Sequence, residues 1–413
     1  MKAIVISIGD EILIGQVLNT NAAYISEKLN SVGIEAARIL TVGDDEVEIL
    51  NAFKEYYSRY DIIIVTGGLG PTQDDVTRSA VCKFFDLKLI SSKEVRHNVE
   101  EFLKKRNRNW SDAAENQTLF PAGAKVIPNK YGTAAGEFFE RDTKYFIVLP
   151  GVPYEMESMM EDFVIPFFLE IKMNRYILHR TLMTTGIAES ELAGRLGNLD
   201  NILQGAKLAF LPSPTGVRLR ITISGTGKNQ CENKIQTIES HIREKANKFI
   251  YGVDEESLEE VLGRILAERK LTIAIAESCT GGMIAHKITN VPGSSRYFER
   301  AIVAYSNQSK INQLHVPKEL IEKHGAVSKE VAEAMAFGIR QNAETDIGIS
   351  TTGIAGPTGG TQEKPVGLVW IGYSDAKETI ALKFNFGDGR LRIKERASQA
   401  AMDFVRRKIL KIE

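Results

Sequence analysis

Cysteine and histidine are scarce in this sequence. The three cysteines, Cys82, Cys231 and Cys279, are odd in number and lie far apart. We therefore expect no disulfide framework, and we expect the protein to lie in a reducing compartment. The six histidines lack the spacing of metal ligands, so we do not expect a zinc site built on histidine.

A long apolar run and an excess of charge of one sign are also missing. The formal net charge is -1, which is not the basic footprint of a nucleic-acid-binding protein. The opening residues, MKAIVISIGDEILIG, form a short apolar stretch interrupted by acids. This pattern fits neither a secretory signal nor a membrane span. We expect a cytoplasmic protein that binds neither nucleic acid nor membranes.

The length of 413 residues predicts two or three domains, because one hydrophobic core usually serves fewer residues. Residues 1–170 alternate apolar strands with helical segments, the pattern of an α/β domain with a parallel sheet. Residues 171–254 have the texture of a small α+β unit. Residues 255–413 return to an α/β pattern, so we predict domain boundaries near 170 and 254.

A glycine-rich turn in the first domain is the first candidate site. The stretch YDIIIVTGGLGPTQDDVT is a buried strand that runs into Gly67, Gly68 and Gly70, and a helix follows. Glycines let the backbone approach a phosphate closely, and a helix N-terminus offers free N–H groups. This turn predicts an anion-binding loop.

Acidic residues beside that loop indicate a metal ion. Asp74 and Asp75 would repel a phosphate unless a divalent cation such as Mg²⁺ lay between them. One of the two acids could instead cap the helix that starts near Val76. Asp10 follows the first strand and should reach the same sheet edge. Asn19 could contact a ligand or cap the next helix, and its position favours the cap.

The second candidate site is AESCTGG, where Ser278, Cys279 and Thr280 stand side by side before Gly281. A strand ends here and a helix begins, so these side chains occupy a turn that can expose a nucleophile. Cys279 is intrinsically the better nucleophile, and adjacent residues face different sides. The residues alone leave the choice between Ser278 and Cys279 open.

A serine nucleophile requires a base, and no histidine lies in a suitable turn. Lys310 in AYSNQSK lies near the same sheet edge, as does Tyr305. A lysine base needs a lowered pKa, which burial provides. By residue type alone, however, Lys310 is typical of a solvated helix lysine and Tyr305 of a core aromatic.

Two further segments complete this expected pocket. STTGIAGPTGG follows a strand, and its Thr352 and Gly353 could line the pocket together with Thr280 and Gly281. In FGDGR, Arg390 stands at a helix start, where its fork of donors suits a substrate phosphate.

The motifs GDEILIGQVLNTN, VTGGLGPTQDDVT, NKYGTAAGE and LPGVPYEM resemble the N-terminal domain of the CinA family. That resemblance implies a molybdopterin-binding-like fold that hydrolyses ADP-ribose to AMP and ribose 5-phosphate with a divalent metal ion, Mg²⁺, Mn²⁺ or Co²⁺. Asp10, Asp74 and Asp75 would hold the metal, and Gly67, Gly68, Gly70 and Asn19 the substrate. The family usually has proline where this chain has Ala135.

Residues 255–413 resemble the C-terminal domain of the same family, through AESCTGG, AYSNQSK, STTGIAGPTGG and FGDGR. The resemblance implies deamidation of nicotinamide mononucleotide without a cofactor. It implies Ser278 as nucleophile, Lys310 as base, Tyr305 as proton relay or orienting group, and Arg390 as phosphate ligand. Residues 171–254 resemble the KH-like linking domain of the family, and a homodimer is implied.

A second class of function remains open at this stage. The front domain could belong to a nucleotide- or molybdopterin-binding regulatory protein that binds its ligand without hydrolysing it. The acids beside the glycine loop favour catalysis over binding alone.

Overall fold

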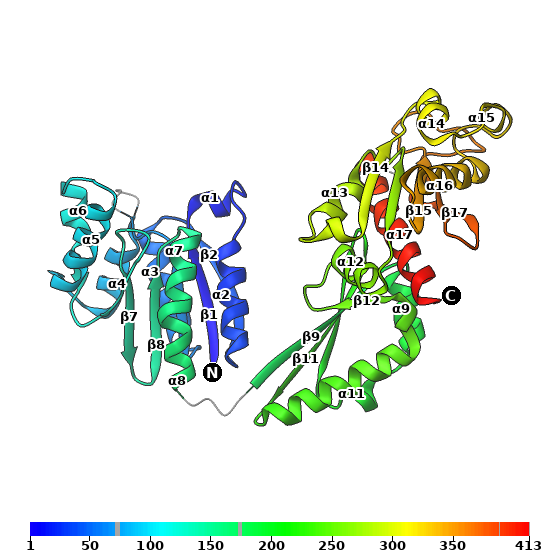
Figure 1. The fold of residues 1–413 in the computed structure, drawn as a ribbon. Coiled ribbons are helices and arrows are strands. Elements are labelled where there is room, and N and C mark those ends of the chain that lie inside the picture. Colours follow the sequence, from blue (N-terminus) through cyan, green and yellow to red (C-terminus); the bar gives the residue numbers. More distant parts are fainter. Residues whose placement is uncertain (71–74, 172–175, 388, 413) are drawn as a thin grey trace. The chain divides into compact units, whose positions relative to one another are not determined.

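The computed structural model describes residues 1–70, 75–171, 176–387 and 389–412. The chain divides into two compact units, the first formed by Met1–Leu178 and Ile223–Glu232, the second by His179–Thr222 and Asn233–Glu413. The first unit contains a six-stranded sheet, and the second contains a five-stranded sheet (Figure 1). Among the described residues, no helix combines the length and the apolar character that a membrane crossing needs.

The first unit contains a six-stranded sheet of order β2-β1-β3-β8-β7-β6. Strands β2, β1, β3 and β8 are parallel, and β7 and β6 continue the sheet antiparallel. The strands are β1 (Lys2–Ile8), β2 (Glu35–Val42), β3 (Ile62–Thr66), β6 (Lys125–Ile127), β7 (Gly136–Arg141) and β8 (Lys144–Leu149), with a separate pair β4 (Leu89–Ser91) and β5 (Leu119–Pro121). The parallel sheet expected from the strand and helix alternation is present.

Helices cover both faces of this sheet (Figure 1). Alternate residues of β1 enter different cores: Val5 packs with α2 and α7, whereas Ile4 and Ile6 pack with α3. This alternation follows from the two-residue period of a strand buried on both faces. The helices are α1 (Asp10–Leu13), α2 (Thr20–Ser31), α3 (Glu46–Tyr57), α4 (Thr77–Phe85), α5 (Lys93–Lys105), α6 (Asp112–Gln117), α7 (Pro153–Met159), the π-helical turn η1 (Met160–Val164) and α8 (Ile165–Glu170).

The middle segment forms a four-stranded sheet of order β10-β11-β9-β12 beside the long helix α11. The short loop at residues 225–228 leads from β11 into the start of α11. The elements are β9 (Tyr176–Thr184), α9 (Glu189–Leu196), α10 (Asp200–Leu203), β10 (Lys207–Ser213), β11 (Gly216–Gly225), α11 (Lys228–Ala246), the 3-10 turn η2 (Asn247–Phe249) and β12 (Ile250–Val253).

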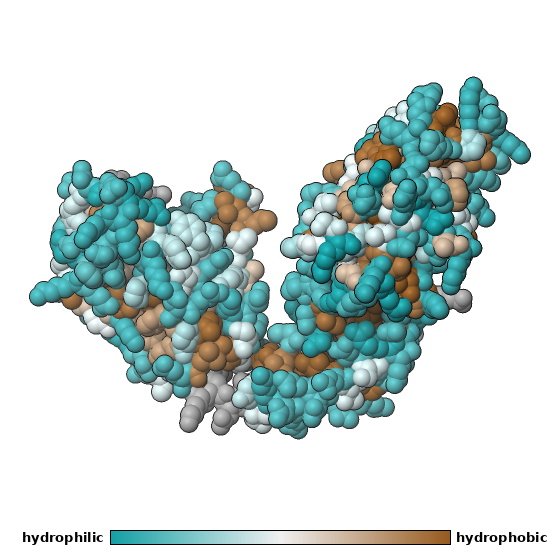
Figure 2. All heavy atoms as spheres, viewed as in Figure 1, coloured by the Kyte–Doolittle hydropathy of each residue, from teal (hydrophilic) through white to brown (hydrophobic). Residues whose placement is uncertain are grey.

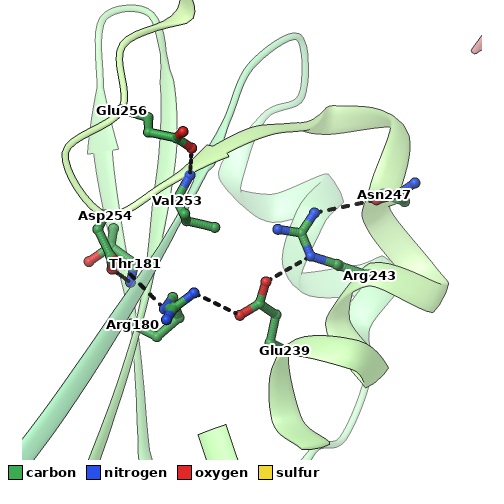
Figure 3. A network of polar contacts seen from close by, with 8 residues as sticks. All are labelled: Arg180, Thr181, Glu239, Arg243, Asn247, Val253, Asp254 and Glu256. Carbon is green, nitrogen blue, oxygen red and sulfur yellow. Dashed lines mark hydrogen bonds and ion pairs between the residues drawn. The ribbon is translucent and has the colours of Figure 1, made fainter. Parts of the chain in front are cut away.

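A polar network fastens α11 to this sheet (Figure 3). Glu239 on α11 accepts from Arg243 Nε at 2.8 Å and from Arg180 Nη1 of β9 at 3.4 Å. On the other side of β9, the N–H of Thr181 donates to Asp254 at 2.9 Å. One carboxylate thus bridges the helix and a strand, which fixes how α11 lies on the sheet.

The C-terminal segment contains a five-stranded sheet of order β14-β13-β15-β16-β17. Strands β14, β13 and β15 are parallel, so their carboxyl ends lie at one edge, while β16 and β17 are antiparallel. The strands are β13 (Ile273–Glu277), β14 (Phe298–Val303), β15 (Ile347–Gly353), β16 (Leu368–Ser374) and β17 (Thr379–Asn385). Ligands bind beyond the carboxyl ends of parallel strands, which is where the AESCTGG turn lies.

Helices again cover both faces of this sheet. Helix α16 packs on one face, and α12, α13 and α17 pack on the other, through separate apolar clusters. The helices are α12 (Leu258–Arg269), α13 (Met283–Thr289), the 3-10 turn η3 (Ser294–Arg296), α14 (Asn307–Leu314), α15 (Lys318–His324), α16 (Lys329–Ala343) and α17 (Arg390–Leu410).

Candidate functional site

The AESCTGG turn is held in place by Glu277, the last residue of β13. Its buried carboxylate accepts hydrogen bonds from the N–H groups of Gly282, Ile284 and Ala285, at 2.9, 3.2 and 2.9 Å. The acid therefore caps the N-terminus of α13, where a negative charge is stabilised by the helix dipole. Gly281 and Gly282 have φ values of 60° and 89°, which favour glycine. The hydrogen bonds to Glu277 and the backbone conformation of the two glycines together fix the position of the turn.

Ser278 and Lys310 are brought together at this edge of the sheet. Lys310 Nζ lies 3.1 Å from Ser278 Oγ, and the two residues are 1% and 8% exposed. The residue-type expectation of a solvated Lys310 is wrong, because its Nζ contacts Ser278 and the main chain of Ala304 and Tyr305 instead of solvent. Ser306 caps α14 by accepting a hydrogen bond from the N–H of Ser309 at 3.0 Å.

The surroundings of Lys310 favour its neutral form. Burial lowers the pKa of the Lys310 ammonium below its usual value, and no described carboxylate forms an ion pair with it. Its Nζ also lies 2.8 Å from the Ala304 carbonyl oxygen and 3.2 Å from that of Tyr305. A neutral amine has two N–H donors for these carbonyls and keeps one lone pair for the Ser278 hydroxyl. The arrangement matches a base that can accept the serine proton.

Cys279 faces the other way. It is 5% exposed and belongs to the apolar cluster between the sheet and α12, α13 and α17. Burial raises the pKa of the Cys279 thiol to about 12, so its thiolate is disfavoured. Of the two residues, Ser278 is the one that lies beside Lys310 Nζ, and its role as nucleophile stays a prediction.

Tyr305 contacts Arg390 rather than Ser278. Arg390 Nη2 donates to the Tyr305 hydroxyl at 3.0 Å, and Nη1 donates to the Gly356 carbonyl at 2.8 Å. The tyrosine is 60% exposed, so the residue-type expectation of a core aromatic is wrong. Strand β14 ends at Val303, which leaves Tyr305 on the loop before α14. Arg390 is the first residue of α17, as expected.

The threonines of the pocket have distinct partners. The Thr280 hydroxyl lies 2.7 Å from that of Thr351, and the N–H of Ser278 donates to the Thr351 carbonyl at 3.0 Å. The Thr352 hydroxyl instead donates to the Ala326 carbonyl at 2.7 Å. Gly353 ends β15, where a Cβ atom would lie 2.6 Å from the Leu368 carbonyl oxygen. Thr351 and Glu277 are thus structural partners of the turn that the sequence analysis did not single out.

A second cation approaches the same turn. A Cβ atom on Gly281 would lie 3.5 Å from Lys394 Nζ. Lys394 is one helical turn after Arg390 on α17, and it is not among the predicted site residues. The i, i+4 spacing along α17 was the signal that could have identified it.

In the first unit, the glycine turn lines a cavity of about 510 Å³. A Cβ atom on Gly67 would lie 2.2 Å from the Ile8 carbonyl oxygen, so only glycine allows this approach. Gly68 and Gly70 line the cavity as well, and the N–H of Gly70 donates to Asp75 Oδ1 at 2.7 Å. Helix α4 begins at Thr77 without a side-chain cap, so Asp75 does not cap it.

The acids at this cavity differ in part from those expected. Glu11, Asp44 and Asp75 line it, whereas Asp10 lies beside it and exchanges hydrogen bonds with Asp44, at 2.9 and 3.3 Å. Asp74 lies outside the described residues. Within the described ranges, no group of three or more acidic, cysteine or histidine side chains is placed to hold a metal ion. Carboxylates and a phosphate loop remain the donor set that suits Mg²⁺, which is held by one or two carboxylates plus substrate phosphates.

Glu155 is a fourth acid at this cavity, and the sequence analysis did not identify it. Asn129 Nδ2 donates to Glu155 at 2.6 Å and to the Ala134 carbonyl at 2.9 Å. Burial raises the pKa of the Glu155 carboxyl. Asn129 therefore links NKYGTAAGE to LPGVPYEM, and the Ala135 position of the first motif is buried.

Asn19 has the capping role that its position favours. Its side-chain oxygen accepts from the N–H of Ala22 at 3.1 Å, and it also lines a cavity of about 90 Å³ that shares Ile8, Glu11 and Gly151 with the larger one. Exposed apolar side chains of the α1 region stand beside this smaller cavity, and Figure 2 shows the resulting brown surface. These side chains are Leu13, Ile14, Val17 and Leu18.

Comparison with known families covers nearly the whole chain. Residues 255–409 match the family described as "CinA C-terminal domain", and residues 4–170 match "Probable molybdopterin binding domain". Residues 179–252 match "Damage-inducible protein CinA KH domain". The fold class predicted from the sequence, α/β with a KH-like middle segment, is confirmed.

Individual relatives match along their full length. A competence-damage inducible protein of Caldicellulosiruptor saccharolyticus is 43% identical over 410 residues, covering 99% of this chain and 100% of the relative. A CinA-like protein of Kosmotoga olearia is 45% identical over 410 residues, with 99% of both chains covered. The crystal structure of competence/damage inducible protein CihA from Agrobacterium tumefaciens is 35% identical and covers 36% of this chain and 94% of its own, with a TM-score of 0.35.

Proposed function

This chain belongs to the CinA family, and from that premise we propose that it is a hydrolase with two active sites. The C-terminal site deamidates nicotinamide mononucleotide to nicotinate mononucleotide and ammonia. The site in the first unit hydrolyses ADP-ribose to AMP and ribose 5-phosphate. The observation that carries the proposal is the buried contact between Lys310 Nζ and Ser278 Oγ at 3.1 Å.

Acylation is the first step proposed for the C-terminal site. Neutral Lys310 takes the proton of Ser278, and Oγ attacks the carboxamide carbon of the substrate. The oxyanion that forms needs hydrogen-bond donors; we propose as one of them the N–H of the buried Thr280, which has no acceptor among the described residues. Lys310 then gives its proton to the leaving nitrogen, so the C–N bond breaks and ammonia departs.

Deacylation restores the enzyme. Lys310 takes a proton from a water molecule, which attacks the ester carbon, and the proton returns to Ser278 Oγ as the C–O bond breaks. The products are the nicotinate form and free enzyme, so one water molecule is consumed in each cycle. No cofactor is needed, because the lysine supplies both proton transfers.

The substrate phosphate is proposed to bind at the start of α17. Arg390 is oriented by its bonds to Tyr305 and to the Gly356 carbonyl, and a guanidinium fork suits a phosphate. Lys394 lies near enough to Gly281 to add a second positive charge. In this assignment Tyr305 positions Arg390 rather than relaying a proton.

In the first unit, the glycine turn and its acids are proposed to hold the diphosphate. The backbone of Gly67, Gly68 and Gly70 approaches the phosphates closely. Asp75, with the predicted ligands Asp10 and Asp74 and the neighbouring Glu11 and Asp44, would hold a divalent metal ion. When bound, that ion neutralises phosphate charge and makes the diphosphate a better electrophile. Glu155, which lines the cavity and accepts a hydrogen bond from Asn129, is proposed to orient the attacking water.

Separate assays of the purified chain with nicotinamide mononucleotide and with ADP-ribose, each with and without divalent metal, test this proposal. We expect ammonia release that is independent of metal and AMP formation that requires it. Ser278→Ala should abolish the first and spare the second, while Cys279→Ala should keep most of both. If Cys279→Ala lost ammonia release and Ser278→Ala kept it, the nucleophile would be Cys279 and not Ser278.

The alternative is that the first unit binds nucleotides or molybdopterin without hydrolysing them. It predicts saturable ADP-ribose binding with no AMP formed under any metal condition. The four acids at the anion cavity favour turnover over this alternative.

A further inference from the structure

The second unit contains a cavity that the proposed chemistry does not use. It measures about 540 Å³ and lies between the β10–β11 turn, the segment after β9, strand β17 and helix α17. Neither Ser278 nor Lys310 lines it. The volume is that of a small-molecule site.

A single buried amide indicates that this cavity is a binding site. Gln399 on α17 is 5% exposed, and its side chain lines the cavity. It makes no hydrogen bond with any residue that the structure describes. Its amide atoms are not sealed from solvent, so its donor and acceptor are available to water or to a ligand that enters the cavity.

The walls around Gln399 favour a flat ring. Phe384 and Phe386 stack with ring centroids 5.4 Å apart and an interplanar angle of 6°, and both line the cavity together with Leu382 and Phe404. A planar heterocycle placed against these apolar side chains gains from burial and ring stacking.

The charges at the cavity cancel. The charged lining residues are Glu189, Arg396, Asp403 and Arg407, two acids and two bases. Asp403 Oδ2 lies 2.7 Å from Arg407 Nε, and Arg396 donates to the carbonyls of Pro214 and Phe386, at 3.1 and 3.0 Å. Arg396, Asp403 and Arg407 thus already have partners. The two acids and two bases sum to a net charge of zero, so the cavity does not favour a phosphate.

We propose that this cavity binds a neutral planar heterocycle whose edge carries a donor beside an acceptor. The Gln399 amide presents the complementary pair, as glutamine does toward an adenine edge. An aminopurine base and a pyridine carboxamide both have this edge, so adenosine and nicotinamide are the two probes that distinguish the sources. The proposal does not depend on either hydrolytic activity.

Titration calorimetry of the full chain with adenosine and with nicotinamide tests the proposal. We expect one of the two probes to bind and Gln399→Leu to weaken that binding at least tenfold. Ala400→Phe, which fills the cavity from the same helix, should abolish it. Gln308→Leu, on the exposed face of α14, is the matched control and should bind as the unmodified chain does. Binding should persist in Ser278→Ala, which removes only the deamidase nucleophile.

Three results would overturn the proposal. One is the absence of binding by either probe at millimolar concentration. Another is binding that survives both Gln399→Leu and Ala400→Phe, because the ligand would then lie elsewhere. The third is tighter binding of AMP than of adenosine that is lost in Gln399→Leu, which would contradict the neutral-ligand assignment. The thermal unfolding midpoint of each variant shows whether it is folded.

Discussion

Lys310 Nζ and Ser278 Oγ lie 3.1 Å apart, with both residues almost fully buried. The lysine comes from the first turns of α14, and the serine from the turn after β13. Lys310 can take the serine proton only when its amine is neutral, and burial favours that neutral form. This pair sets the pH dependence that we expect for the deamidase.

Ammonia release should increase as the pH rises through the lowered pKa of Lys310 and then reach a plateau. The cause is the burial that lowers this pKa, because only the neutral amine can accept the serine proton. Lys310→Arg keeps a positive charge at all of these pH values and should lose about 10²- to 10⁴-fold in kcat/KM. The measurement is kcat/KM for nicotinamide mononucleotide against pH. A rate that is flat with pH, or retained in Lys310→Arg, would contradict this role.

Tyr305→Phe should raise KM for nicotinamide mononucleotide by roughly three- to tenfold and leave kcat nearly unchanged. The change removes the hydroxyl that accepts from Arg390, and one hydrogen bond contributes about this factor. Nicotinamide riboside, which lacks the phosphate, is the control substrate and should be unaffected. A large loss of kcat with both substrates would instead assign Tyr305 to proton relay.

The burial of Glu137 should make the first unit less stable as the pH rises from 4.5 to 7. Burial raises the pKa of the Glu137 carboxyl to about 7 despite the Arg78 guanidinium 3.0 Å away. Between its unfolded and folded pKa values, the folded chain keeps a proton that the unfolded chain has lost, so stability falls with pH there and levels off above. Glu137→Gln should therefore gain stability relative to the unmodified chain, by about 1 to 3 kcal/mol, between pH 5 and pH 8.

Denaturant unfolding at the two pH values measures this difference. Glu140→Gln, an exposed change on the same strand, is the matched control and should show no such trend. A difference between Glu137→Gln and the unmodified chain that is constant with pH would contradict the raised pKa.

AMP formation from ADP-ribose should fall at least tenfold in Asp75→Asn and on addition of a chelator. Asp75 lines the anion cavity and accepts from the glycine turn, and an amide is a weaker ligand than a carboxylate for a hard cation. Asp112→Asn, an exposed acid on α6, is the control. Turnover that is indifferent to both changes would end the metal hypothesis for this site.

The sequence predicted where the turns lie better than it predicted what their side chains contact. The strand and helix periodicity indicated both α/β folds, and the glycines marked both turns. The burial of Lys310 could not be predicted, because it depends on how α14 packs against a sheet edge that is remote in sequence. Asp44 and Glu155 reach the anion cavity for the same reason, through strands distant from the glycine motif. By its sequence position alone, Gln399 is an ordinary helix residue. Its place in a cavity depends on β17 and the β10–β11 turn, which are distant from it in sequence.

Identification of the residue that is acylated during turnover distinguishes a serine nucleophile from a cysteine nucleophile. The enzyme is mixed with a saturating concentration of nicotinamide mononucleotide, and the reaction is quenched with acid at millisecond times. The protein is then digested, and its peptides are mapped by mass spectrometry. If Ser278 is the nucleophile, a nicotinate mononucleotide ester forms on its Oγ. An adduct on Cys279, or the absence of an adduct at every quench time while ammonia is released, would contradict it.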